Sequence, residues 1–348
     1  MELMHFSEGA RTNFGDDLNI WLWKELLPRL WEQDGVRFSG IGTILNQELM
    51  PPGHKWIVLG SGIGYGRPPV DFGSDSWQVL AVRGPLTARA LKIDRSFAVT
   101  DGAILLSALP QCKPLPESER SGIVFMPHYQ SMPAGNWEEV CRVAGFEFID
   151  PCGSSKAIVE RIRRAKFVLA DAMHAAIVAD TLRVPWIPLI TSSTINTLKW
   201  LDWTESMGTQ YEPTYLRPSS SMEAWRNRTN FLFAERFCLP EKTVESAMKD
   251  YEFKCNLLEK PWWPVWRKLS RGFLYRVPLD VYRSKLMQGA RRSDLRAHIE
   301  TSAESLRRAA TLRPYLSSDE TFNRRKAQML EAVSRVPACI QLLSSFGR

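Results

Sequence analysis

The stretch FVLADAMHAAIVADTLRVPWIPL, residues 167–189, places two short apolar runs on either side of an alanine-rich segment with helical spacing. Short apolar runs that alternate with helical stretches are typical of βαβ units, which build parallel sheets. The same alternation recurs earlier in the chain, with strands expected at 56–60, 77–83 and 96–101 and a helix that starts near Pro85. The pattern therefore predicts an α/β fold in which helices cover parallel strands.

A proline-rich, charged segment divides the chain into two parts. Residues 110–122 read PQCKPLPESERSG, a composition typical of an interdomain linker. A second α/β run follows this segment, and the remainder of the chain is largely helical in pattern. We expect an N-terminal domain over 1–112, a second domain over 113–240 and a helical extension over 241–348. Two such α/β domains would face each other across a cleft.

Composition and the amino-terminal sequence bear on the class and location of the protein. The chain has 348 residues, 44% of them hydrophobic and 24% charged, as in ordinary soluble proteins. It contains no apolar run long enough for a transmembrane helix, and its first residues lack the pattern of a secretory signal. The six cysteines are scattered without a C-x-x-C pair, which argues against a zinc site and a disulfide framework. We expect a cytoplasmic protein without a bound metal.

The net charge of +7 calls for an anionic partner, such as nucleic acid, a membrane surface or a phosphorylated substrate. Segment 260–292 concentrates this charge, because Asp280 is its only acidic residue. Its basic residues are Lys260, Arg267, Lys268, Arg271, Arg276, Arg283, Lys285, Arg291 and Arg292. The segment is also rich in tryptophan and tyrosine, which favour membrane interfaces. Two interpretations remain open: a basic helix pair that packs its tryptophans into the core, or a surface that binds anionic lipid.

Four polar side chains follow expected strands directly: Arg83, Asp101, His128 and His174. Each has a structural alternative when taken alone, since a surface arginine or a histidine satisfied by its neighbours is common. However, α/β sheets bind ligands at the carboxyl ends of their strands. The shared position therefore predicts that these four residues meet at one site.

Two glycine-containing loops are further candidates for ligand contact. The loop LGSGIGYG follows a strand, but it does not match G-x-G-x-x-G, and prolines stand where a helix would open. Gly60, Ser61 and Gly62 therefore form either a wall that lets backbone approach a ligand or a tight turn. In NFGDDLN, Asp16 or Asp17 is expected to cap a helix, and such a helix entry also suits an anion.

Several motifs, read in order, resemble the polysaccharide pyruvyl transferase family. They are NFGDDLN, GSGI, VRGPLTARAL, TDGAILL, MPHY and ADAMHAAIVADTLRVPWIPL, followed by INTLKWLDW. The likeness covers roughly residues 10–205 and is closest to the bacterial exopolysaccharide branch, as in succinoglycan-type or xanthan-type biosynthesis.

The resemblance implies a GT-B-like architecture of two Rossmann-like domains facing across a cleft, with a helical C-terminal region. It also implies transfer of pyruvate from phosphoenolpyruvate to two hydroxyls of a sugar, which releases phosphate and leaves a cyclic ketal, without a cofactor. By position, His174 matches the catalytic histidine and Asp101 the acidic residue before the next helix. The residues that match the family's substrate-binding positions are Asn13, Gly15, Asp16 and Arg83. A histidine suits this reaction because its imidazole can give and take protons near neutral pH.

The chain departs from the family at the histidine motif. Family members often have Arg-Leu-His, and the arginine helps to hold the donor, whereas this chain has Ala172-Met173-His174. We expect the donor's anionic groups to be bound by other residues, with Arg83, His128 and Lys199 as candidates.

The family also implies an acceptor, a lipid-linked oligosaccharide at the inner face of the cytoplasmic membrane. Segment 260–292 would then bind anionic lipid and make the protein peripheral to that membrane. Two other functions remain as alternatives: a GT-B glycosyltransferase that uses a nucleotide-sugar, and a non-enzymatic nucleic-acid-binding protein. The basic residues cluster in one late segment and no nucleic-acid-binding motif is present, which disfavours nucleic acid as a partner.

Overall fold

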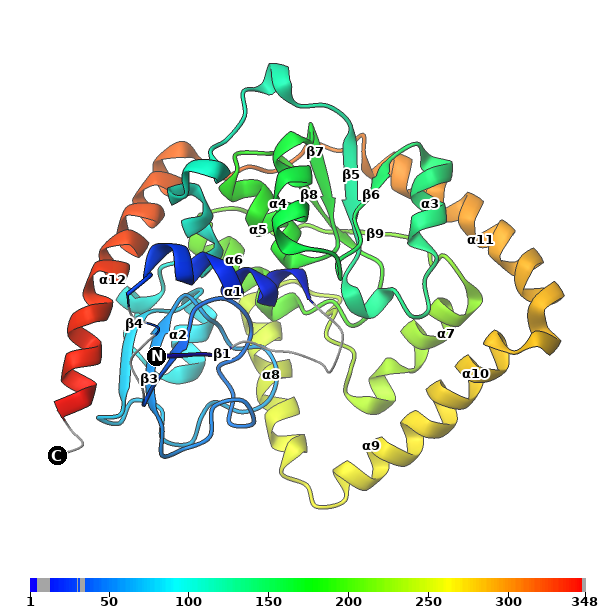
Figure 1. Cartoon of the computed structure of the whole chain (residues 1–348). Coiled ribbons are helices and arrows are strands. Elements are labelled where there is room, and N and C mark those ends of the chain that lie inside the picture. The colour runs from blue at the N-terminus through cyan, green and yellow to red at the C-terminus, as the bar shows by residue number, and fades with distance from the viewer. Residues whose placement is uncertain (5–12, 30, 32–34, 346–348) are drawn as a thin grey trace.

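The computed structural model describes residues 1–4, 13–29, 31 and 35–345 (Figure 1). Within this part of the chain, the strands form two parallel sheets with helices packed around them. The α/β class with parallel sheets is therefore confirmed. The expected linker at 110–122 lies between the last strand of the first sheet and the first strand of the second.

The first sheet has the order β1-β2-β3-β4 and the second the order β6-β5-β7-β8-β9. The strands are β1 (Glu2–Met4), β2 (Val36–Ser39), β3 (Lys55–Leu59), β4 (Trp77–Ala81), β5 (Ile123–Met126), β6 (Glu147–Phe148), β7 (Phe167–Ala170), β8 (Trp186–Ile190) and β9 (Thr214–Tyr215). The expected strands at 56–60 and 77–83 are thus confirmed as β3 and β4 to within two residues.

The helices are longest toward the carboxyl end of the chain. They are α1 (Phe14–Leu26), α2 (Pro85–Leu91), α3 (Trp137–Ala144), α4 (Ser155–Arg164), α5 (Met173–Thr181), α6 (Thr197–Met207), α7 (Ser221–Thr229), α8 (Val244–Leu258), α9 (Trp263–Arg271), α10 (Val277–Arg283), α11 (Gln288–Ala309) and α12 (Asp319–Ser345). None of the helices described here combines the length and the hydrophobicity that crossing a membrane requires.

The strand expected at 96–101 is wrong. Residues Arg95–Phe97 form a single 3₁₀ turn, and only Ala98 makes an isolated bridge to Val82 beside β4. The segment nevertheless runs along the edge of the first sheet, because Val82 N donates to Phe97 O and Val99 N donates to Val82 O. Asp101 therefore still reaches the carboxyl edge of this sheet, where it begins a second 3₁₀ segment, Gly102–Ala108.

The second sheet is covered on both faces, which explains why its strands read as nearly continuous apolar runs. Along β5 and β7, alternate residues point to opposite faces. Phe125 and Leu169 share a cluster with Ile299 of α11 and with residues of α3. Val124 and Val168 belong instead to the large core cluster, which contains residues of α4 and α5 and extends to the first sheet.

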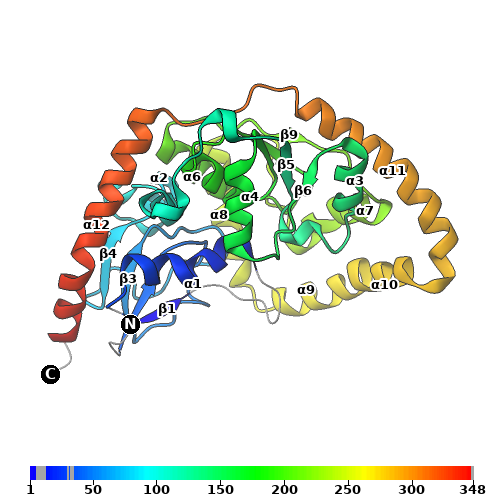
Figure 2. The same cartoon turned by 45° about the horizontal axis from the view of Figure 1, so that its top comes forward.

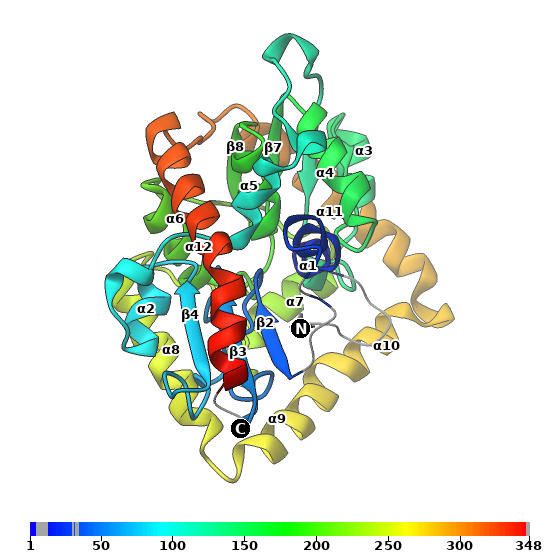
Figure 3. The same cartoon turned by 60° about the vertical axis from the view of Figure 1, so that its left-hand side comes forward.

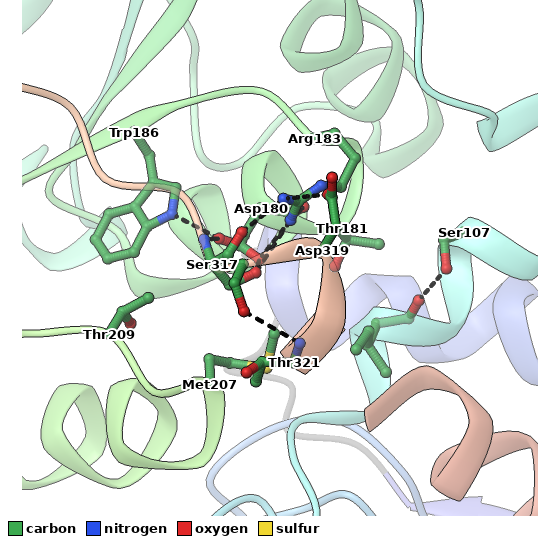
Figure 4. A network of polar contacts seen from close by, with 12 residues as sticks. Ser107, Asp180, Thr181, Arg183, Trp186, Met207, Thr209, Ser317, Asp319 and Thr321 are labelled. Atoms are coloured by element: carbon green, nitrogen blue, oxygen red, sulfur yellow. Dashed lines mark hydrogen bonds and ion pairs between the residues drawn. The ribbon is translucent and has the colours of Figure 1, made fainter. Parts of the chain in front are cut away.

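The last helix returns from the second sheet to the first. Helix α12 lies across β2, β3 and β4, as Figure 3 shows from the side. Its approach is fixed by Asp180 of α5, which accepts hydrogen bonds from Ser317 N (2.8 Å) and from Trp186 Nε1 (3.1 Å) (Figure 4). The described part of the expected extension, residues 241–345, is largely helical, but its last helix packs on the N-terminal sheet.

A buried ion pair also connects the two halves of the chain. Arg83, which follows β4, donates from Nε to Asp202 Oδ2 of α6 at 3.0 Å, and neither side chain is exposed. The other carboxylate oxygen of Asp202 accepts the backbone N–H groups of Leu86 and Thr87 at the start of α2, each at 2.9 Å. Asp202 therefore fixes α2 and the end of β4 against α6.

We expect Asp202→Ala to destabilise the fold by about 3–5 kcal/mol, because it leaves the Arg83 guanidinium buried without its counter-charge. Asp319→Ala is the matched control. It removes an ion pair to Arg183 in which the carboxylate is 86% exposed, so a loss of at most about 1 kcal/mol is expected. Chemical denaturation, monitored by circular dichroism, measures the free energy of unfolding of both variants. Equal losses in the two variants would contradict a structural role for the buried pair.

Candidate active site

A cavity of about 400 Å³ lies where the two halves of the chain meet. The start of α1 and the loops 43–49 and 64–66 line it from the first half. The carboxyl ends of β5 and β7, together with parts of α5 and α6, line it from the second half, and α8 and α9 contribute further along. The cavity therefore occupies the position at which parallel α/β sheets bind ligands.

His174 lies in the first turn of α5 and lines this cavity. Its Nε2 is 3.8 Å from Oδ2 of the fully buried Asp101, and the histidine side chain is 11% exposed. Within the described structure neither of these two atoms has a hydrogen-bond partner. The other oxygen of Asp101 accepts the backbone N–H of Ala103 at 3.0 Å, which fixes the carboxylate. A buried carboxylate with a fixed position therefore faces the Nε2 atom of His174.

Gly15 of α1 makes room for the His174 ring. A Cβ atom built on Gly15 would collide with Nδ1 and the neighbouring ring carbons of His174. The packing of α1 against α5 therefore requires glycine at this position, and the resulting contact holds the imidazole against Asp101. This contact joins two motifs that lie about 160 residues apart in the sequence.

Asp16 is buried beside His174 at the start of α1. The helix begins at Phe14 with Asn13 at its N-cap position, so the prediction that Asp16 or Asp17 caps the helix is wrong. Both aspartates lie instead inside the first turn, and the Asn13 side-chain amide donates to Asp16 Oδ2. Burial raises the pKa of Asp16 to about 6, although the nearby His174 and Lys199 act in the opposite direction. Asp16 is therefore mostly ionised above about pH 6.

Lys199 of α6 is a cation of the cavity wall. Its Nζ lies 5.1 Å from the centre of the Tyr65 ring, and Gly64 leaves space for its aliphatic stem. Burial and the positive charge of Arg83 lower the pKa of Lys199 to about 8, while Asp16 and Asp101 act in the opposite direction. Lys199 is therefore charged at neutral pH, and it is available to an anionic ligand in the cavity.

His128 also lines the cavity, but as a neutral group. Burial, together with the positive charges of Lys199 and Arg226, lowers the pKa of His128 to about 3. Its backbone N–H donates to Asp171 at 2.7 Å, and Asp171 also accepts the backbone N–H of Thr191 at 2.8 Å. His128 can therefore hydrogen-bond a ligand but cannot supply a positive charge at neutral pH.

The structure does not bring Arg83 to the cavity, contrary to its predicted role in binding the donor. In addition to its bond to Asp202, the guanidinium donates to Thr43 Oγ1 at 2.9 Å and to Ile63 O at 2.5 Å. Its hydrogen-bonding capacity is thus used within the core. Sequence position alone could not reveal this, because the partner carboxylate lies more than a hundred residues away.

The first three residues of the glycine loop, Gly60, Ser61 and Gly62, also do not line the cavity. A Cβ on Gly60 would meet the backbone of Gly102, and one on Gly62 would meet the Arg83 guanidinium. The Ser61 hydroxyl lies 2.7 Å from that of Ser39 in the core. These residues therefore pack the sheet edge rather than contact a ligand. The later part of the same loop, residues 64–66, lines the cavity instead.

Sequence reasoning missed several residues at the site. Asp171 follows β7 directly and fixes the backbone of His128, so the strand-end criterion applied to Asp101 would also have identified it. Arg226 of α7 and Arg267 and Arg271 of α9 line the far end of the cavity. These arginines do not follow a predicted strand, so the strand-end criterion could not identify them as site residues. Within the described residues, no group of three or more histidine, cysteine or acidic side chains could hold a metal ion.

Comparisons with known proteins identify a family and a relative that this chain resembles. Residues 13–193, more than half of the chain, match the family described as polysaccharide pyruvyl transferase. The chain is also 38% identical over 221 residues to the succinoglycan biosynthesis protein ExoV of Rhizobium meliloti (strain 1021). That alignment covers 63% of this chain and 69% of the relative. The matched region contains α1, Asp101 and His174, but it ends before α6 and Lys199.

We expect Gly15→Ala to lower turnover by about a hundredfold, because the added methyl group displaces the His174 ring from Asp101. Gly289→Ala is the matched control, since nothing lies near a Cβ built at that exposed helical position. Steady-state kinetics and thermal unfolding of both variants provide the measurement. If Gly15→Ala stayed folded and fully active, the proposed packing of His174 would be excluded.

Proposed function

The chain belongs to the polysaccharide pyruvyl transferase family, and on this premise we propose that it transfers pyruvate from phosphoenolpyruvate to an exopolysaccharide sugar. The product is a cyclic ketal in which two hydroxyl oxygens of the sugar are joined to one carbon of the pyruvyl group. The acceptor is a lipid-linked oligosaccharide repeat unit. The observation that supports this best is the His174–Asp101 pair at a cavity whose wall also contains the cation Lys199.

The reaction needs one group that moves protons. A proton is added to the methylene carbon of phosphoenolpyruvate, and one sugar hydroxyl attacks the adjacent carbon. The second hydroxyl attacks the same carbon, the bond from that carbon to the phosphate oxygen breaks, and inorganic phosphate leaves with the remaining proton. We assign these transfers to His174, because an imidazole both donates and accepts protons near neutral pH. We assign to Asp101, whose Oδ2 lies 3.8 Å from His174 Nε2, the role of orienting this ring.

The donor has a carboxylate and a phosphate, so its site must supply positive charge. Lys199 is the cation that we assign to this role in place of the arginine that the family often has at the position of Ala172. Ala172 is the N-cap residue of α5 and lines the cavity, so the N-terminal end of this helix points at the same cavity. The positive end of the α5 dipole therefore adds to the attraction of the donor's anionic groups.

The decisive assay combines the protein with phosphoenolpyruvate and extracted lipid-linked intermediates. We expect phosphate release together with the mass gain of one pyruvyl group on the oligosaccharide. Phosphoenolpyruvate should also raise the unfolding temperature, whereas a nucleotide-sugar should not. Stabilisation by a nucleotide-sugar, with glycosyl transfer and no pyruvyl product, would instead support a glycosyltransferase.

We expect His174→Gln to lower kcat by about 10²–10⁴-fold, while KM for phosphoenolpyruvate changes little, because the variant loses proton transfer but keeps the donor's cation. His54→Gln is the matched control, since His54 lies on the loop before β3 and is not part of the cavity wall. The rate of phosphate release gives kcat and KM for both variants. Near wild-type kcat in a folded His174→Gln variant would refute the assignment.

The pKa of Lys199 predicts how donor binding depends on pH. Because the ammonium is charged below about pH 8 and neutral above it, KM for phosphoenolpyruvate should rise as the pH increases through 8. Lys199→Arg should move this rise to higher pH, since arginine stays protonated. Lys199→Met should raise KM by at least about tenfold at neutral pH. Lys156→Met, at an exposed position on α4, is the control, and a pH profile identical to wild type in Lys199→Arg would contradict the role.

A further inference from the structure

Helices α9 and α10 form an arm at the outside of the molecule, which we call the strap (residues 262–287). A π-helical turn, Gly272–Arg276, joins the two helices into one continuous rod. Figures 1 and 2 show the strap running from the end of α8 to the start of α11, along an edge remote from both sheets. One side of the strap rests on the protein, and the opposite side faces outward.

The outward side presents a row of apolar residues, which we call the stripe. It consists of Val265, Leu269, Phe273, Val277 and Val281, spaced four residues apart. Each of these side chains is between 54% and 76% exposed, and Trp262 and Leu286 extend the exposed apolar surface at the two ends. Water-facing helices normally place polar residues at such positions, so a continuous apolar row indicates a binding surface.

The π-helical turn keeps the stripe on one side of the rod. In an α-helix, each step of four residues overshoots a full turn by about 40°, so a row with this spacing winds around the axis. A π-helical turn contains more residues per turn and therefore rotates the row in the opposite direction. Gly272–Arg276 lies at the middle of the stripe, between Leu269 and Val277, where this correction aligns the two halves.

A second row, made of the residues two positions after each stripe residue, faces the protein, as its contacts show. Arg267 and Arg271 each lie 3.1 Å from Glu235 and also line the cavity. Leu279 is buried in a small cluster with Met222 of α7. This inner row attaches the strap to the protein, while each stripe residue remains more than half exposed.

Exposed basic residues accompany the stripe. Lys268 and Arg276 each precede a stripe residue by one position, and Lys260 and Lys285 stand at the two ends. Asp280 is the only acidic residue between positions 260 and 292. The side chain of Arg291, which belongs to the same basic segment, lies outside the described residues. The outward side of the strap is therefore apolar along its centre and positively charged beside it.

We propose that the outward side of the strap binds an anionic lipid surface. The apolar row enters the boundary between head groups and acyl chains, and the lysine and arginine residues pair with lipid phosphates. Tryptophan at position 262 suits the same depth. A second protein copy would have to bury this row while also neutralising several cations, whereas an anionic membrane satisfies both requirements.

Such binding has a consequence for the active site, and this consequence rests on the proposed function. Arg267 and Arg271 connect the strap to the cavity wall, so a strap at the membrane surface places the cavity beside it. An acceptor anchored by a lipid could then reach His174 without leaving the bilayer. Binding of the strap to lipid does not itself depend on the reaction.

The test is co-sedimentation of the full chain with two kinds of vesicle, pure phosphatidylcholine and a mixture of three parts phosphatidylcholine to one part phosphatidylglycerol. We expect binding to the mixed vesicles only, and we expect Phe273→Ser/Val277→Ser to weaken it by at least about tenfold. Val70→Ser is the matched control, because Val70 is equally exposed but lies in the loop before β4. Circular dichroism checks that all variants remain folded.

The proposal would be overturned if the wild-type chain did not bind the mixed vesicles, or if the double variant bound them equally well. A wild-type dimer in light scattering that the double variant abolishes would also overturn it, because the stripe would then contact a second copy. Turnover with a water-soluble acceptor separates this question from the proposed function. The double variant should keep that activity, since neither residue lines the cavity.

Discussion

The fold depends on one buried carboxylate, that of Asp202. It neutralises the Arg83 guanidinium in the core and accepts two backbone N–H groups at the start of α2. Because α2 and the end of β4 belong to the first half of the chain and α6 to the second, these bonds fix the two sheets relative to each other. A buried pair of this kind is costly to break, since either partner alone would be an uncompensated charge. Asp202 therefore joins the two halves of the chain, both of which line the cavity.

The chemistry of the cavity follows from that geometry. Placing the start of α1 against α5 forces His174 onto Gly15 and toward the buried Asp101. The same burial raises the pKa of Asp16 and lowers that of Lys199, so both groups titrate closer to neutrality than they would in water. Between about pH 6 and pH 8 the site therefore contains the ionised Asp16 carboxylate and the charged Lys199 ammonium near His174. Such a site offers a cation to an anionic ligand and a histidine for proton transfer.

Much of this arrangement was predictable from local sequence. Apolar runs and helix signals identified β3, β4, β7 and α2, because these elements are fixed by hydrophobic periodicity and by Pro85. Strand-end position identified His174 and Asp101 as candidates. It failed for Arg83, because a strand-end side chain can turn into the core when a distant residue such as Asp202 provides a charge. Local patterns contain no information about such long-range partners, nor about which side of the strap faces outward.

The proposed pyruvyl transfer requires cleavage of the bond between carbon and the bridging oxygen of phosphoenolpyruvate. A heavy isotope at that bridging oxygen shows which bond breaks. If the protein transfers the pyruvyl group, the label should appear in the released inorganic phosphate, while the oligosaccharide gains an unlabelled pyruvyl ketal. Label retained in free pyruvate, together with phosphate on the oligosaccharide, would show phosphoryl transfer and refute the proposed reaction.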